Sequence, residues 1–149
     1  EYESVLVALD AAQGYPRGAI AAAIKVAARR RRGIHVLVWI HVPQSAPIDA
    51  DMPQAEQAAE SLIEQARLQG GRRVTGHVEK VRPGQAGRMI VDEARELRAQ
   101  AIVMPLPPRT GTGGTLFGKT LETVLADRPC RVIIQSDPAS QSARRPVAA

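Results

Sequence analysis

The segment Gly113–Thr120 (GGTLFGKT) contains the residue types that bind phosphate groups. Its spacing satisfies Gly-x-x-x-x-Gly-Lys-Ser/Thr, in which backbone N–H groups, a lysine and a hydroxyl surround phosphates. Taken literally, the motif predicts a nucleotide hydrolase. Such a loop normally follows the first strand of a larger domain, however, and here a single predicted strand remains after it. We therefore expect only an anion site at the start of a helix. Its residues are Gly113, Gly114, Gly118, Lys119 and Thr120.

Other residues with chemical potential have simpler structural explanations. Asp10 could act as a general base or a magnesium ligand, yet an acidic residue after a first strand also holds a loop or a ribose. His35 and His41 share one strand face, but no cysteine or carboxylate has metal-ligand spacing, so no metal site is predicted. Cys130 stands at the entrance to an apolar strand without an identifiable activating base, which favours a buried structural thiol. We predict no catalytic residue.

Alternating strands and helices must position these residues. Short apolar runs rich in β-branched residues predict strands, and apolar positions at helical spacing predict helices. The expected strands are Ser4–Leu9, Ile34–Val42, Arg73–Arg82, Ala101–Met104 and Arg131–Ile134. The expected helices are Arg17–Arg32, a helix capped by Asp51 that runs to Gln69, Gln85–Arg98 and Gly118–Asp127. The polar third strand is expected to be shorter or nearer a sheet edge.

This order predicts an α/β domain with a five-stranded parallel sheet and helices on both faces, Rossmann-like or flavodoxin-like. The domain should span residues 3–136, followed by a disordered tail over 137–149. In such sheets, ligands bind beyond the carboxyl ends of the strands, where the winding reverses. We expect that reversal beside the first strand, so the predicted cleft lies among Ala8–Asp10, Val42 and the loop after the fourth strand.

Composition limits the class of protein. The chain has 149 residues, 44% of them hydrophobic, which suits one domain with one sizeable core. It has one cysteine and no apolar run long enough to span a membrane, so we expect a soluble, cytoplasmic domain. The chain begins at Glu1, which suggests processing, cleavage from a tag, or excision from a larger protein.

The formal charge of +5 comes largely from Arg29–Arg32. We interpret this run as a solvated helix end, where cations complement the helix dipole. Contact with a phosphate or an anionic membrane surface is the alternative. No aromatic residues interleave with the arginines as stacking platforms, so nucleic acid is not expected as a partner.

Three segments together resemble the universal stress protein A family: VLVALD, WIHV and LFGKTLETVLADRPCRVII. The resemblance covers about residues 3 to 136. It implies a dimeric five-stranded α/β domain of the kind that binds ATP or a related adenine nucleotide in many members. It also implies that four residues surround the adenine or ribose: Ala8, Leu9, Asp10 and Val42.

The family's phosphate motif is Gly-x-x-Gly, nine residues, then Gly-Ser/Thr. Gly118 matches the last glycine, but Lys119 stands where the family has Ser or Thr, and the first two glycines fall on Pro105 and Pro108. Proline has no N–H to donate and cannot adopt positive φ, so the usual triphosphate contacts should be weakened. The glycines at 113 and 114, with Lys119, would then contact phosphate differently.

A second resemblance concerns the segments GIHVLVWIHVP, RLQGGRRVTGHVEKVRPGQAG and AIVMPLPPR. They are similar to the stress-protein-type domain at the cytoplasmic C-terminus of some amino acid permeases of the amino acid–polyamine–organocation class. This implies a membrane transporter in the same chain, which would tether the domain to the inner face of the membrane.

Three functions remain open. The leading prediction is a non-catalytic regulatory domain that binds ATP, AMP, cyclic di-AMP or a similar adenine nucleotide and controls an attached transporter. The alternatives are a nucleotide-free dimerisation module of a stress-response protein and a weak ATP hydrolase. A homodimer is expected in each case, because the apolar fifth strand RVII near the chain end would leave an exposed edge.

Overall fold

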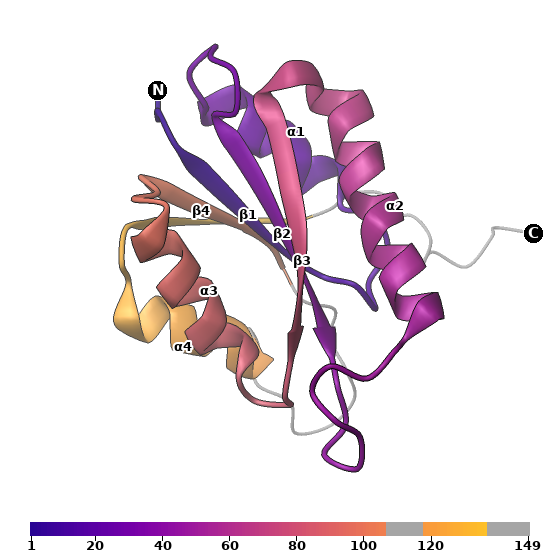
Figure 1. Cartoon of the computed structure of the whole chain (residues 1–149). Helices are drawn as coiled ribbons and strands as arrows, with labels where there is room; N and C mark the ends of the chain where they lie inside the picture. Colours follow the sequence, from indigo (N-terminus) through magenta and orange to yellow (C-terminus); the bar gives the residue numbers. More distant parts are fainter. Residues whose placement is uncertain (107–117, 137–149) are drawn as a thin grey trace, which may run out of the picture.

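The protein is described by a computed structural model, which defines residues 1–106 and 118–136. A five-stranded parallel sheet with the order β3-β2-β1-β4-β5 lies at its centre (Figure 1). The strands are β1 (Val5–Asp10), β2 (Ile34–His41), β3 (Val74–Val81), β4 (Ala101–Pro105) and β5 (Arg131–Gln135). The predicted fold class is confirmed. The strand order matches the first five strands of the Rossmann fold rather than the order of flavodoxin. The winding reverses between β1 and β4, beside the first strand as expected.

Four α-helices cover the sheet, two on each face (Figure 1). They are α1 (Arg17–Val26), α2 (Pro53–Gly70), α3 (Ala86–Glu96) and α4 (Gly118–Asp127), and a 3-10 turn spans Gly71–Arg73. Two apolar cores result, one under α1 and α2 and the other under α3 and α4. None of the helices in the described ranges is long and apolar enough to cross a membrane.

The central strands are apolar on both faces because helices cover both. In β1, Val7 and Leu9 enter the core under α1 and α2, whereas Leu6 and Ala8 enter the core under α3 and α4. The edge strand β3 differs. Its α2 face carries Val74, Gly76 and Val78 and then Lys80, whereas the opposite face carries the polar residues Thr75, His77 and Glu79 and ends in the buried Val81. The prediction of an edge position for this strand is confirmed, although at eight residues β3 is not short.

The first helix ends six residues before the predicted Arg32, and a tertiary contact explains why. Tyr2 donates its N–H to the carbonyl of Val26 at 2.8 Å, and Ala28 donates its N–H to the carbonyl of Tyr2 at 2.8 Å. This short parallel bridge draws the chain out of the helix at Val26. Arg29–Arg32 therefore follow α1 instead of forming its last turn, so the helix-end interpretation of these arginines was wrong.

The prediction that Asp51 caps the second helix was also wrong. Met52 precedes α2, and no side-chain cap is formed there. Instead, the Glu56 carboxylate accepts the N–H of Met52 at 2.7 Å, so a side chain from within the helix satisfies the N–H of the residue before it. The other predicted boundaries agree within two residues; the ends predicted at Met104 and Ile134, for example, each extend by one residue, to Pro105 and Gln135. The predicted tail over 137–149 lies outside the described residues.

Candidate functional site

The predicted cleft lies at the edge of the sheet where the parallel strands end. Asp10 closes β1 and Pro105 closes β4, on the two sides of the winding reversal. Because α4 connects two parallel strands, it starts at the same edge, with Gly118. The fold therefore brings the first strand's carboxylate and the start of the last helix to one edge. Gly113, Gly114 and Pro108 lie outside the described residues.

Three of the predicted site residues near this edge are buried. Ala8, Leu9 and Val42 are 0%, 2% and 0% exposed. Val42 also donates its N–H to the carbonyl of Val81 at 2.8 Å, which ties the end of β2 to the end of β3. These residues shape the edge through packing.

Asp10 is the polar member of the first-strand group, and its side chain is 23% exposed. One carboxylate oxygen, Oδ1, accepts the N–H of Ala12 at 2.9 Å, which fixes the turn after β1. The other, Oδ2, lies 3.7 Å from Nε2 of His41. That nitrogen accepts the indole N–H of Trp39 at 3.0 Å, so His41 does not also donate from it to Asp10. Oδ2 is thus left with acceptor capacity toward the surface.

The start of α4 has a backbone conformation suited to glycine. Gly118 has a φ of 73°, which side chains with a Cβ rarely adopt. Lys119 is exposed and Thr120 is half-buried. This helix packs closely against α3. An added Cβ on Gly87 of α3 would lie only 3.0 Å from the carbonyl oxygen of Thr120. The first turn contains no acidic residue, so its N–H groups and Lys119 present positive charge.

The end of β4 shows how one of the two prolines is accommodated. Pro105 pairs with Gln135 of β5, and the next residue, Leu106, donates its N–H to the carbonyl of Gln135 at 2.9 Å. The backbone at this point is therefore engaged by the neighbouring strand. Because proline supplies no N–H, position 105 offers a ligand no backbone donor.

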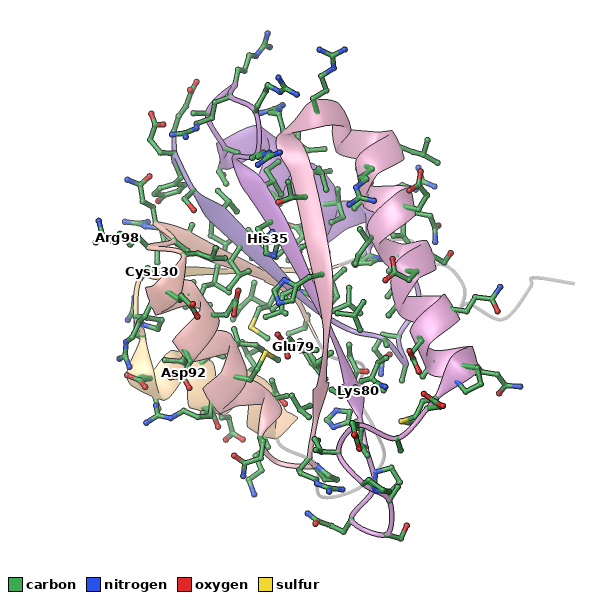
Figure 2. The ribbon with its side chains drawn as sticks, in the orientation of Figure 1. His35, Glu79, Lys80, Asp92, Arg98 and Cys130 are labelled. Atoms are coloured by element: carbon green, nitrogen blue, oxygen red, sulfur yellow. The ribbon has the colours of Figure 1, made fainter. Side chains whose placement is uncertain are left out.

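The sequence analysis missed a second polar cluster, on the α3 side of β2 and β3. Nε2 of His35 and Nδ1 of His77 are 2.6 Å apart. Nδ1 of His35 lies 2.7 Å from the Thr75 hydroxyl. Nε2 of His77 lies 3.2 Å from Glu79 and 3.9 Å from Glu93, which α3 contributes. Figure 2 shows His35 and Glu79 along this part of the sheet.

The environment of this cluster keeps His35 neutral. Burial, and secondarily the nearby His77, lower the pKa of His35 to about 4. Burial also raises the pKa of Glu93, and the carboxylates of Glu96 and Glu79 add to that effect while His77 opposes it. The signal in the sequence was the alternation of polar residues in β3, at Thr75, His77 and Glu79. His35 and His41 do share a strand face, but the partner of His35 is His77.

A shallow groove of about 390 Å³ lies beside the outer edge of β3, away from the winding reversal. Its lining is Ile48, Asp49, Glu56, Glu60, Val78, Glu79 and Lys80. The one cation among them is already engaged, because Lys80 donates to the carbonyl of Ala50 at 2.8 Å and lies 3.4 Å from Glu56. The excess of carboxylates makes this groove unsuited to a phosphate group.

The strand order and the helices on both faces define a doubly wound α/β domain whose winding reverses between β1 and β4. The chain belongs to the universal stress protein family, whose model matches residues 1–135. A universal stress protein from Archaeoglobus fulgidus is 25% identical, with a TM-score of 0.65, and the alignment covers 91% of this chain and 99% of that one.

Two further structures share the fold. The A. fulgidus protein in complex with dAMP is 24% identical, with a TM-score of 0.63 and coverage of 90% and 98%. A universal stress protein in complex with cAMP is 20% identical, with a TM-score of 0.54 and coverage of 91% and 98%. No curated protein sequence is similar enough to count as a match.

Proposed function

We propose that this domain binds an adenine nucleotide at the carboxyl edge between β1 and β4 and acts as a regulatory module without catalysis. The observation that carries the proposal is the shared edge of Asp10 and Gly118, one with a free acceptor oxygen and the other opening a helix at a φ of 73°. Family membership supports it, as do the dAMP and cAMP complexes of relatives with the same fold.

Each end of the site suits one part of a nucleotide. Oδ2 of Asp10 can accept a hydrogen bond from a ribose hydroxyl, while Oδ1 remains tied to the turn after β1. The first turn of α4 presents N–H groups without an intrahelical partner, and Lys119 adds a full charge beside them. Ala8, Leu9 and Val42 are buried and support this edge through packing from within the sheet.

The phosphate end departs from the family pattern in a way that favours ligands with one phosphate at this position. Pro105 and Pro108 replace two glycines, and Lys119 replaces a hydroxyl residue. A triphosphate needs several backbone donors, and these replacements remove two of them. We expect ATP to bind with a Kd near or above about 1 mM, which corresponds to about 4 kcal/mol. AMP, cyclic AMP or cyclic di-AMP should bind more tightly.

The proposal assigns the domain a regulatory role because we expect no catalysis at this site. Catalysis needs a nucleophile or base beside the phosphate, and Cys130, the one cysteine of the chain, is not suited to it. Burial raises the pKa of the Cys130 thiol, which lowers its thiolate fraction at neutral pH. Control of an attached amino acid transporter, and a cytoplasmic location at the membrane, follow from the permease resemblance and stay predictions.

Calorimetry against AMP, ATP, cyclic AMP and cyclic di-AMP tests the proposal. We expect saturable binding of at least one of the three smaller or cyclic ligands, weakened by Asp10→Asn. Binding of none of the four would instead support the nucleotide-free dimerisation module. Micromolar ATP binding would show that our interpretation of the prolines is wrong, and turnover of ATP with magnesium would support the weak hydrolase.

A further inference from the structure

Three metal-ligating side chains from three different elements converge on the α3 side of the sheet. His35 comes from β2, His77 from β3 and Glu93 from α3, and one ligand atom of each lies within 4.8 Å of the other two. All three residues are half-buried. The group lies in the first half of β2 and the middle of β3, whereas Asp10 and Val42 stand at the carboxyl ends of β1 and β2.

We propose that His35, His77 and Glu93 form a binding site for a divalent transition-metal ion, with Zn²⁺ the best match. Two imidazole nitrogens and a carboxylate are a common protein ligand set for this ion, and a water completes the tetrahedron. Ligand atoms around tetrahedral Zn²⁺ are about 3.3 Å apart, given metal–ligand distances of about 2.0 to 2.2 Å. The Glu93 side chain, which is 20% exposed, would therefore have to move closer to the two rings to complete the site.

The two rings already face each other through the nitrogens that would hold the ion. Nε2 of His35 and Nδ1 of His77 lie 2.6 Å apart and share a hydrogen. A metal ion would replace that hydrogen, and the rings would separate slightly.

The other nitrogen of each ring is held by a polar partner. Nδ1 of His35 is 2.7 Å from the Thr75 hydroxyl, and Nε2 of His77 is 3.2 Å from Glu79. With the metal bound, each of these nitrogens carries its N–H and donates to that partner. Such outer contacts fix the tautomer and the ring orientation of metal-binding histidines. Thr75 and Glu79 are thus positioning residues for the site.

Charge supplies an independent reason for a cation here. Glu79 and Glu93 place two carboxylates beside the same ring, 3.2 Å and 3.9 Å from Nε2 of His77, and like charges in one site repel each other. No lysine or arginine in the described part of the chain forms an ion pair with Glu79 or Glu93. A divalent ion between the two histidines and Glu93 would relieve this repulsion.

Zinc calorimetry on the whole chain, freed of any affinity tag and treated with a chelator, tests the site. We expect one Zn²⁺ per chain. Glu93→Gln should weaken binding by more than about tenfold, and Glu79→Gln by about 10-fold to 100-fold. His77→Ala should abolish binding. His41→Ala is the matched control, because it removes the remaining histidine of the chain. Its Zn²⁺ affinity should equal that of the wild type.

No saturable binding by the wild type, an unchanged affinity in Glu93→Gln, or an equal loss in His41→Ala would each overturn the proposal. Histidine ¹H–¹⁵N spectra of the unmodified chain keep the test valid if a variant fails to fold. Zn²⁺ should shift Nε2 of His35 and Nδ1 of His77 and leave His41 unchanged. Shifts confined to His41 would place the ion elsewhere. Neither result depends on nucleotide binding, so the two proposals can fail separately.

Discussion

The two halves of the sheet on either side of β1 present different chemistry at equivalent places. Each ends in an edge strand, β3 on one side and β5 on the other. On its α3 face, β3 carries Thr75, His77 and Glu79, whereas the middle of β5 is Val132, Ile133 and Ile134, all half-buried. Polar side chains on an edge strand discourage pairing with another chain, and apolar ones favour it.

The difference shows that the fold determines where the strands end, whereas the side chains on each edge strand determine the chemistry of that edge. In the β4–β5 half, our proposals concern partners outside the chain, namely a nucleotide at α4 and a second copy at β5. In the β2–β3 half, one ligand atom each of His35, His77 and Glu93 lies within 4.8 Å of the other two, across three elements. We therefore propose recognition in one half and an internal polar site in the other.

The largest expected effect is on self-association, which tests the predicted difference between the edge strands β3 and β5. If β5 is an association edge, light scattering should give a mass near twice 16.0 kDa for the wild type. Ile134→Lys should return the mass to that of one chain, because a lysine on an edge strand opposes pairing. Thr75→Lys places the same side chain on the other edge and should leave the dimer intact. A wild-type mass near 16.0 kDa at high concentration contradicts the prediction.

Removal of one charge tests the phosphate end of the β4–β5 half. Lys119→Ala should weaken a phosphate-bearing ligand by about 1.5 to 3 kcal/mol, the range for a hydrogen bond to a charged group. Calorimetry with the ligand that binds the wild type measures it. His77→Ala, in the other half, serves as the control and should leave this affinity unchanged. Equal affinity of Lys119→Ala and the wild type, with the fold intact, would move the phosphate site elsewhere.

A glycine substitution tests how closely the β2–β3 half is packed on its other face. A Cβ on Gly76 would lie 2.8 Å from Cγ2 of Ile63 in α2 and 3.0 Å from the carbonyl oxygen of Val36. Gly76→Ala should therefore lower the free energy of unfolding by about 1 to 3 kcal/mol, the usual cost of overpacking. Gly14→Ala is the control, since nothing lies within 4 Å of its added Cβ. Denaturant unfolding compares the two, and equal stability of both variants would show that α2 yields easily.

The fold was predictable from the sequence because each buried strand is a short apolar run and each crossover is forced to one hand. The approximate place of the ligand edge followed from the same rules. What the sequence could not give depends on contacts between distant segments. Tyr2 ends α1 by bonding to Val26, and Glu56 replaces Asp51 at the start of α2.

The histidine cluster shows the same limit. His35 and His77 are 42 positions apart and meet only through the parallel register that pairs His77 with Leu37. No spacing rule for metal ligands connects them, and the third residue, Glu93, comes from a helix. The alternation in β3 marked a polar face, but only the strand order placed His35 beside it.

The smallest expected effect concerns Cys130, the ionisable thiol of the β4–β5 half. Burial raises the pKa of Cys130 because the thiolate loses solvation, and the residue packs at the edge of the core under α3 and α4. The thiolate is the form that reacts, so alkylation by iodoacetamide at pH 8 should be slower than that of a free cysteine. The rate should keep rising as the pH passes 10, where a free thiol with a pKa of about 8.5 has nearly reached its plateau. Denatured protein provides the control, because unfolding restores an ordinary thiol. A native rate equal to the denatured rate at pH 8 would contradict the prediction and would show that this thiol is open to solvent.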